Sequence, residues 1–381
     1  MAKKKKILIL IDWFTPGYKA GGPIQSCVNI CKALHTHYDI FVLTTDTDHG
    51  ETAPYPGILS NQWIADAELG VSIFYAVKKT LGREQIKTAI LAINADIVYL
   101  NLLFAPFFAV YPLWLKLTGV ITSKVVMCPR GTLYESALCV KRYKKMPLLW
   151  LYKRMGIHKK ITFHATNERE QEAIAKYFPG SQIVIADNLP DTTQSFFESC
   201  KKDTGSLKCI FIARIVPIKN LLYVLQVLKN ITDTISLTIA GPAENEAYWN
   251  ECKKLIDQLP QHISVQYAGA KNKKEINALL QQHHLLLLPT KGENFGHAIF
   301  EALLAGRPVL ISDQTPWLQL EQTNAGWDYP LSQPELFIKK IAQLAAADQQ
   351  EFDQYAKGAW QYAHDFINNP ALTEPYKMLF E

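Results

Sequence analysis

Short runs of apolar residues alternate with longer amphipathic stretches through the first half of the chain. The apolar runs predict buried strands at residues 7–11, 39–45, 71–75, 97–101, 123–128, 161–165 and 183–186. Strands that alternate with helical stretches are typical of a parallel sheet covered by helices. We therefore expect residues 1–190 to form one α/β domain.

The second half repeats this pattern after a polar, poorly patterned stretch at residues 187–208, which we interpret as the domain connection. Its apolar runs predict strands at residues 209–213, 237–240, 265–267 and 285–288. A length of 381 residues also favours two domains over one. We expect a second doubly wound domain over residues 191–354.

Residues 97–115 carry no charge over 19 positions, which is long enough to suggest a membrane span. Asn101, Pro106 and Pro112 interrupt the run. The stretch is better explained as a buried strand followed by a helix that begins near Pro106.

The stretch at residues 290–308 combines a polar loop with a short helix. Residues 291–296 form the loop, residues 297–305 the helix, and Gly306 ends it. The backbone N–H groups at residues 294–297 carry the positive end of the helix dipole and favour an anion.

Two carboxylates, Glu293 and Glu301, flank this helix start and are separated by seven residues. Either one alone could equally be a solvated residue. Together they can accept hydrogen bonds from neutral hydroxyls next to an anion site. A sugar nucleotide carries both features, a diphosphate and many hydroxyls.

Two further candidate loops each follow the first predicted strand of a domain. Gly21 and Gly22 lie between the first strand and first helix, in a glycine-rich turn that suits close approach to phosphate but that alone is a weak signal. Arg214 and Lys219 follow the strand at residues 209–213; two cations there can clamp a diphosphate or be exposed loop charges. The sequence has neither G-x-G-x-x-G nor G-x-x-x-x-G-K-[ST], which argues against dinucleotide oxidoreductases and P-loop enzymes.

The Glu-Asn-Phe-Gly loop, the second Glu eight positions on, and Glu-Ala-Leu-Leu-Ala-Gly-Arg-Pro-Val resemble the donor-site signature of retaining glycosyltransferases of family 4. The resemblance is tight over residues 209–310 and looser before. It implies a GT-B fold, in which two Rossmann-like doubly wound domains face a central cleft. It also implies that a C-terminal helix at about residues 355–381 crosses back onto the first domain.

The resemblance implies roles for the residues above. Glu293 would bind sugar hydroxyls and Glu301 the ribose, while Arg214 and Lys219 would neutralise charge on the leaving diphosphate. The donor-binding set would comprise Gly21, Gly22, Asn294, Phe295, Gly296, His297 and Glu301. No cofactor and no metal are expected if the cations do this work.

Two other polar positions are candidates in the first domain. Arg130, in the Pro-Arg-Gly turn after a strand, is the candidate for an acceptor or phosphate contact, or else a plain surface arginine. Asp46-Thr47-Asp48 is an Asp-x-Asp triplet, which holds a divalent metal in another glycosyltransferase class, although we do not expect that here. The histidine that other family members place near the reacting bond is missing, so no histidine base is inferred.

Charge is distributed unevenly along the chain. Residues 1–190 hold 23 Lys/Arg against 14 Asp/Glu, whereas residues 191–381 hold 17 against 21. Residues 136–167 contain eight basic residues and no acid. This segment could lie on an anionic membrane or be a solvated face over a packed apolar stripe. The candidates for membrane contact are Lys141, Arg142, Lys144, Lys145 and Trp150.

The sequence therefore predicts a retaining glycosyltransferase that moves a hexose-type sugar from a nucleoside diphosphate sugar to a glycan or lipid-linked acceptor, in surface polysaccharide synthesis. A GT-B-like sugar-nucleotide epimerase or phosphorylase is the alternative, and a basic nucleic-acid-binding protein is a distant one. Seven scattered cysteines suit reduced thiols in a cytoplasm. We expect a cytoplasmic protein, peripheral at the inner membrane face if the basic segment binds lipid.

Overall fold

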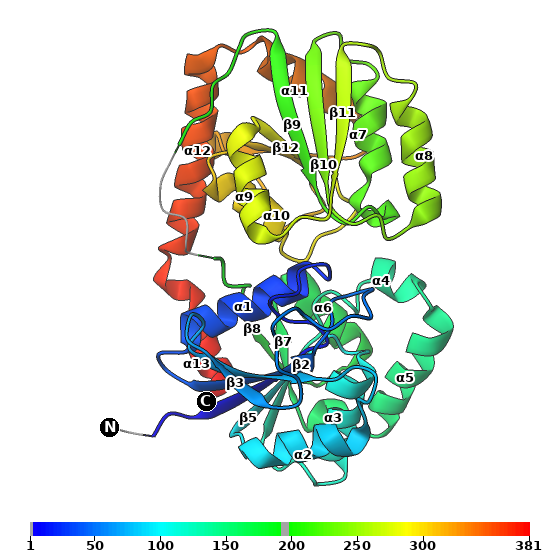
Figure 1. Ribbon diagram of the computed structural model, residues 1–381, viewed down its shortest axis with the longest axis vertical. Coiled ribbons are helices and arrows are strands. Elements are labelled where there is room, and N and C mark those ends of the chain that lie inside the picture. The colour runs from blue at the N-terminus through cyan, green and yellow to red at the C-terminus, as the bar shows by residue number, and fades with distance from the viewer. Residues whose placement is uncertain (1–2, 192–197) are drawn as a thin grey trace. The chain divides into compact units, whose positions relative to one another are not determined.

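The computed structural model describes residues 3–191 and 198–381. The chain divides into two compact units, one of residues 1–189 and 370–381 and the other of residues 190–369. Each unit is built on a mainly parallel sheet with helices packed on it (Figure 1). The predicted class, two doubly wound α/β domains, is confirmed.

The first unit contains an eight-stranded sheet in the order β3-β4-β2-β1-β5-β6-β7-β8. Its strands are β1 (Lys6–Leu10), β2 (Asp39–Thr45), β3 (Trp63–Asp66), β4 (Val71–Ala76), β5 (Ile97–Asn101), β6 (Lys124–Cys128), β7 (Thr162–Ala165) and β8 (Gln182–Ile185). All pairs are parallel except β3 with β4. Central strands are covered on both faces, so they appear in the sequence as continuous apolar runs. The short edge strand β3 was not predicted, because its half-buried residues form no such run.

Helices cover this sheet: α1 (Gly22–Leu34), α2 (Arg83–Ile93), the π-helix η1 (Pro106–Val110), α3 (Tyr111–Leu117), α4 (Glu135–Cys139), α5 (Arg142–Arg154), η2 (Ile157–Lys159), α6 (Glu168–Tyr177), η5 (Pro370–Leu372) and α13 (Glu374–Phe380). Pro23 suits the first turn of α1, where its missing N–H removes no hydrogen bond. The uncharged stretch after β5 becomes helical at Pro106, as predicted. None of the helices in the described part of the chain has the length and apolar character needed to cross a bilayer.

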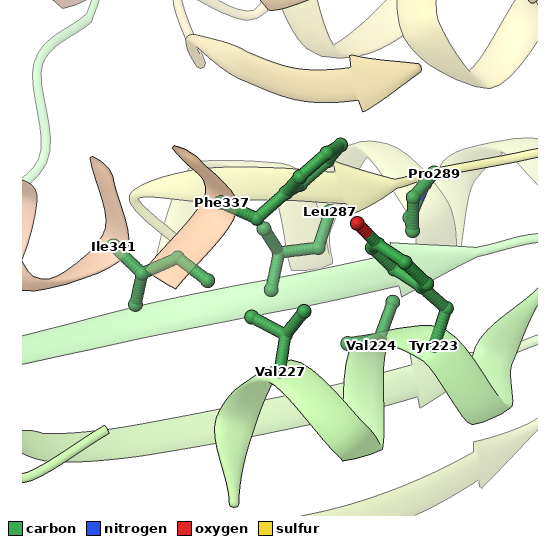
Figure 2. Close-up of a pocket in the computed structure, with 7 residues that line it drawn as sticks. All are labelled: Tyr223, Val224, Val227, Leu287, Pro289, Phe337 and Ile341. Carbon is green, nitrogen blue, oxygen red and sulfur yellow. The ribbon is translucent and has the colours of Figure 1, made fainter. Parts of the chain in front are cut away.

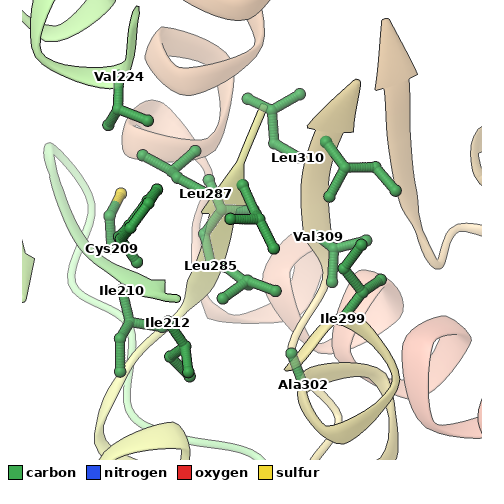
Figure 3. Close-up of a cluster of buried hydrophobic side chains, with 14 of the residues drawn as sticks. Cys209, Ile210, Ile212, Val224, Leu285, Leu287, Ile299, Ala302, Val309 and Leu310 are labelled. Carbon is green, nitrogen blue, oxygen red and sulfur yellow. The ribbon is translucent and has the colours of Figure 1, made fainter. Parts of the chain in front are cut away.

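The second unit contains a fully parallel six-stranded sheet in the order β11-β10-β9-β12-β13-β14. Its strands are β9 (Ser206–Ile212), β10 (Thr234–Ala240), β11 (Ile263–Gly269), β12 (Leu285–Leu288), β13 (Val309–Ser312) and β14 (Gly326–Tyr329). Its helices are η3 (Pro217–Lys219), α7 (Leu221–Leu228), α8 (Glu246–Ile256), α9 (Lys273–Gln282), α10 (His297–Leu304), η4 (Leu320–Thr323), α11 (Pro334–Ala346) and α12 (Gln349–Ile367). Figure 3 shows side chains of β9, β12 and β13 meeting those of α7 and α10 in the core.

The long helix α12 belongs to the second unit. Its Phe366 ring lies 5.5 Å from that of Phe300 and 5.2 Å from that of Trp317, and Ala359 and Ala363 are buried in the same core. We expected about residues 355–381 to return to the first domain. Residues 355–369 instead belong to the second unit, because the face of α12 that carries Ala359, Ala363 and Phe366 packs on α10. Residues 370–381 belong to the first unit, where α13 buries Tyr376, Leu379 and Phe380.

Gly358 of α12 allows a close backbone approach. A Cβ atom at this position would lie 2.5 Å from the Thr323 carbonyl oxygen and 2.7 Å from that of Asn324. Gly358→Ala is therefore expected to lower the free energy of unfolding of this unit by about 1–3 kcal/mol, measured by urea unfolding, because backbone atoms must shift. Lys357→Ala, at the exposed neighbouring position, is the control. Equal stability of the two variants would contradict this packing of α12.

Candidate functional site

An ion pair between Lys219 and Glu293 lies at the carboxyl end of the second sheet. Lys219 ends η3, which follows β9, and Glu293 lies in the loop between β12 and α10. The strands β9 and β12 are neighbours in a parallel sheet, so the loops that follow them emerge at the same edge. The side chains are 16% and 12% exposed, so the pair is largely shielded but reachable from solvent.

Hydrogen bonds between the two loops fix the backbone beneath this pair. Thr290 Oγ1 donates to the Ile218 carbonyl at 3.0 Å, and Lys291 N donates to the same oxygen at 2.8 Å. Asn220 Nδ2 donates to the Pro289 carbonyl at 2.9 Å. These bonds hold Lys219 and Glu293 on a fixed frame, so the pairing does not depend on two long side chains alone.

The start of α10 is fixed by an aromatic anchor. The Phe295 ring lies 5.1 Å from the Trp317 ring, and Trp317 Nε1 donates to the Phe295 carbonyl. Gly296 then takes φ 81°, where a side chain would be strained, and becomes the N-cap of α10. The first turn of α10 therefore directly follows the loop that carries Glu293 and Asn294, and His297 is the first residue of that turn. The buried Trp317 was missed from sequence, because it lies 22 residues after the carbonyl that it holds.

Glu301 lies one turn into α10 and is half-buried. Burial raises the pKa of its carboxyl above the usual range, and the nearby Lys273 cation opposes that shift. Lys273, at the start of α9, forms an ion pair with Asp191. Neither Lys273 nor Asp191 was singled out from sequence, since each looked like one charge in a polar segment.

Arg214 follows β9 and forms an ion pair with Glu244 at 2.9 Å between Nη1 and Oε2. Its side chain is 40% exposed. Gly241, after β10, brings the backbone against this position, since a Cβ atom there would lie 1.9 Å from the Ala213 carbonyl oxygen. The two predicted diphosphate cations, Arg214 and Lys219, thus each have a carboxylate partner in this structure. A bound phosphate would compete with those partners.

The glycine-rich loop of the first unit is held by Asp48. Its carboxylate accepts from the backbone N–H groups of Tyr18 at 2.9 Å and Lys19 at 3.2 Å. Gly21 takes φ 72°, and among the described residues no atom beyond the adjoining backbone lies within 4 Å of the place that a Cβ would occupy. The loop is therefore anchored at its start and open at Gly21.

The Asp-x-Asp triplet has structural partners. Besides the contacts of Asp48, the Asp46 carboxylate accepts from Ser60 Oγ at 2.9 Å and from Lys78 N at 3.1 Å. Within the described residues, no three His, Cys, Asp or Glu side chains are grouped so as to hold a metal ion.

Arg130 is buried in a network of neutral groups in the first unit. Its Nε donates to Asn101 Oδ1 at 2.7 Å, its Nη1 to Asn188 Oδ1 at 2.8 Å and its Nη2 to the Tyr99 hydroxyl at 3.2 Å. An acceptor or phosphate contact by this side chain would have to replace some of these bonds. The same network includes His164, and burial lowers the pKa of that ring to about 3, so it is neutral.

Asp12 is an acidic residue that the sequence analysis missed. It lies two residues after the end of β1, and its backbone carbonyl accepts from Thr45 Oγ1 at 2.6 Å. Burial raises the pKa of its carboxyl to about 6, and the Lys78 cation opposes that shift. An acid placed directly after a buried first strand was the signal that could have revealed it.

Asp12 should make the first unit less stable as pH rises. The unfolded carboxyl has a pKa near 3.8 and the folded one near 6, so the folded chain binds more protons between these values and stability falls from about pH 4 to about pH 6. Asp12→Asn should therefore melt at a higher temperature than the unsubstituted chain at pH 7.5 and at a similar one near pH 4. A melting difference that does not change with pH would show that Asp12 titrates normally.

An apolar hollow lies beside the candidate site. Figure 2 shows it between α7, α11 and the end of β12, lined by Tyr223, Val224, Val227, Leu287, Pro289, Phe337 and Ile341. The only polar group drawn there is the Tyr223 hydroxyl, which is buried without a hydrogen-bond partner. This lining suits no diphosphate, so the hollow is a packing feature rather than the donor site.

Comparisons with known proteins agree with this fold. Residues 192–359 match the model of the family described as glycosyl transferases group 1. Sucrose-phosphate synthase from Thermosynechococcus elongatus superposes with a TM-score of 0.74 at 13% identity, covering 99% of this chain and 98% of that one. HepE from Anabaena, in complex with UDP and glucose, gives 0.71 at 14% identity, covering 98% of both chains.

A third similar structure is WaaG, a glycosyltransferase involved in lipopolysaccharide biosynthesis, with a TM-score of 0.66 at 13% identity and 98% of both chains covered. No curated protein sequence matches this chain. The predicted GT-B fold, with a Rossmann-like sheet in each unit, is confirmed by these likenesses.

Proposed function

We propose that this chain is a glycosyltransferase that moves a hexose-type sugar from a nucleoside diphosphate sugar to a glycan or lipid-linked acceptor. The observation that carries the proposal is the shielded Lys219–Glu293 pair at the carboxyl edge of the second sheet. It lies within the residues that match the glycosyl transferase model. Ligands of open α/β sheets bind at this edge.

The pairing suggests how the donor engages the site. A diphosphate attracts Lys219 and Arg214 away from their carboxylates, because it offers several charged oxygens to each cation. The movement of Lys219 releases Glu293, whose carboxylate then accepts from sugar hydroxyls. Donor binding and the freeing of Glu293 are thus one exchange of partners.

The same cations assist the reaction. Negative charge grows on the diphosphate as the bond from the anomeric carbon to the phosphate oxygen breaks, and Arg214 and Lys219 stabilise it. In the proposed retaining path, the acceptor hydroxyl attacks from the side of the leaving group. Its proton passes to the departing phosphate oxygen. The products are the glycoside and the protonated nucleoside diphosphate.

The remaining donor contacts are assigned by position. The backbone N–H groups at the start of α10, those of Asn294, Phe295, Gly296 and His297, face phosphate oxygens. Glu301 accepts from the ribose hydroxyls. Gly21 and Gly22 stay predicted contacts of the diphosphate, and Arg130 stays the acceptor-side candidate. Because HepE has been solved with UDP-glucose, UDP-hexoses are the first donors to try.

Surface polysaccharide synthesis in the cytoplasm is the proposed setting. A panel of nucleoside diphosphate sugars, screened by thermal shift and then for transfer, tests the function. One donor should raise the melting temperature and be consumed only when an acceptor is present. Epimer exchange of the donor, or transfer to phosphate, would instead identify an epimerase or phosphorylase.

Glu293→Gln should reduce turnover by about a hundredfold or more, because the sugar loses a charged acceptor in the transition state. The structure adds a second expectation: affinity for the nucleoside diphosphate product should not fall, because Lys219 no longer has a competing carboxylate. Steady-state kinetics measure the loss of turnover, and isothermal titration calorimetry measures the affinity for the nucleoside diphosphate. Glu251→Gln, an exposed glutamate of the same unit, should change neither.

Lys219→Ala should weaken nucleoside diphosphate binding and reduce turnover, and the double variant with Glu293→Gln should be less impaired than the two single losses added together, since the residues are coupled. Additive losses would show that the pair does not act as one unit.

Turnover should also survive EDTA, because Arg214 and Lys219 supply the positive charge that a divalent cation would otherwise provide. Initial rates with and without EDTA measure this. Loss of activity that Mn²⁺ restores would refute the metal-free mechanism and return attention to Asp46 and Asp48.

A further inference from the structure

The helix α5 exposes apolar side chains on the face that points away from the core. Tyr143, Trp150 and Leu151 are 72%, 66% and 42% exposed. Tyr143, Pro147, Trp150 and Leu151 recur at spacings of four, three and one, so they share one helix face. We call these four residues the outer face of α5. Figure 1 shows α5 on the periphery of the first unit.

The outer face of α5 does not contribute to the packing of the helix on its own unit. The opposite side of α5 buries Leu149 and Tyr152 in the core, with Met146 and Leu148 packed against it. One apolar stripe is enough to hold a surface helix, and the other side is normally polar. Five of the twelve exposed large hydrophobic side chains in the described residues lie within residues 140–155. The outer face is therefore a second apolar stripe that packs on none of the residues that the structure describes.

Cations surround this stripe. Residues 136–167 contain no acid, and their basic side chains are Lys141, Arg142, Lys144, Lys145, Lys153, Arg154, Lys159 and Lys160. Among the described residues, no carboxylate lies within ion-pair distance of any of the eight; the nearby Glu135 pairs instead with Lys176. Lys144 Nζ lies over the Tyr143 ring, 5.7 Å from its centroid. The surface thus combines exposed aromatic rings with positive charge that no ion pair neutralises among the described residues.

We infer that the outer face of α5 binds the surface of a bilayer that contains anionic lipid. The helix lies along the bilayer, with Tyr143 and Trp150 in the headgroup layer and Leu151 beneath it, because Trp and Tyr rings prefer that layer. The flanking cations contact lipid phosphates and other anionic headgroups. This inference goes beyond the proposed function and does not depend on it, since lipid binding needs no donor or turnover.

Charge selects this occupant over a second copy of the chain. A two-fold dimer through the outer face would bring the same surface of both copies together and oppose eight cations with eight. An anionic bilayer instead offers opposite charge to the cations and an apolar layer to the rings. It therefore satisfies both features of the surface at once.

Flotation with vesicles tests the inference. The full chain should float with phosphatidylcholine vesicles that contain 30% phosphatidylglycerol, remain unbound with phosphatidylcholine alone, and be released as NaCl rises toward 0.5 M, because salt screens these contacts. Failure to bind the anionic vesicles at low salt, or equal binding to neutral ones, would overturn the inference.

Substitutions separate the two features of the surface. Gln at Lys141, Arg142, Lys144 and Lys153 should weaken binding by roughly a hundredfold or more, since each cation near an anionic surface contributes about fivefold. The matched control places Gln at the exposed Lys229, Lys254, Lys274 and Lys357, an equal change in net charge, and should bind almost normally. An equal loss in the control would overturn the inference in favour of non-specific attraction.

Trp150→Ser should weaken binding at least tenfold and make the remainder more sensitive to salt, whereas Leu59→Ser, at a site that is 64% exposed, should not. Circular dichroism must show that all variants fold. Two further measurements test the other occupants.

Analytical ultracentrifugation detects self-association, and a dimer that Trp150→Ser dissociates would assign the surface to a second copy of the chain instead. A titration with heparin detects an acidic soluble partner, and heparin binding that persists where vesicle binding fails would assign the surface to such a partner.

Discussion

The adjacency of β9 and β12 in the second sheet determines where the candidate site forms. Parallel neighbours release their following loops at one edge, and three hydrogen bonds then join these loops beneath the Lys219–Glu293 pair. The aromatic anchor of Phe295 on Trp317 sets the start of α10 relative to the same edge. The chemistry proposed for the donor therefore depends on backbone contacts that are made before any ligand binds.

Buried polar groups also fix the positions of loops in the first unit. Asp48 and Asp46 satisfy backbone N–H groups of the loops around them. Arg130, in the turn after β6, is joined to β5 and to the segment after β8 through neutral acceptors. A buried polar atom without a partner is destabilising, so these networks constrain the loops to one arrangement. The glycine-rich loop consequently has a fixed start and an open tip at Gly21.

The outer face of α5, unlike these polar networks, is not satisfied by contacts within its own unit. Folding buries Leu149 and Tyr152 and leaves Trp150 and Tyr143 in water, although all four are on one helix. The apolar surface left exposed is surrounded by charge of one sign. Surfaces of this kind are explained by what they meet outside the chain, because nothing in the unit's own packing requires them.

The sequence by itself determined the two sheets, since buried strands and amphipathic helices repeat with local periods. It also marked the loop at residues 291–296 and the residues around it. Tertiary structure alone decided that Glu293 meets Lys219, 74 positions earlier, because strand order selects that pairing and no local pattern encodes it. For the same reason the burial of Arg130, the placement of α12 and the direction in which Trp150 points followed only from packing between segments distant in the chain.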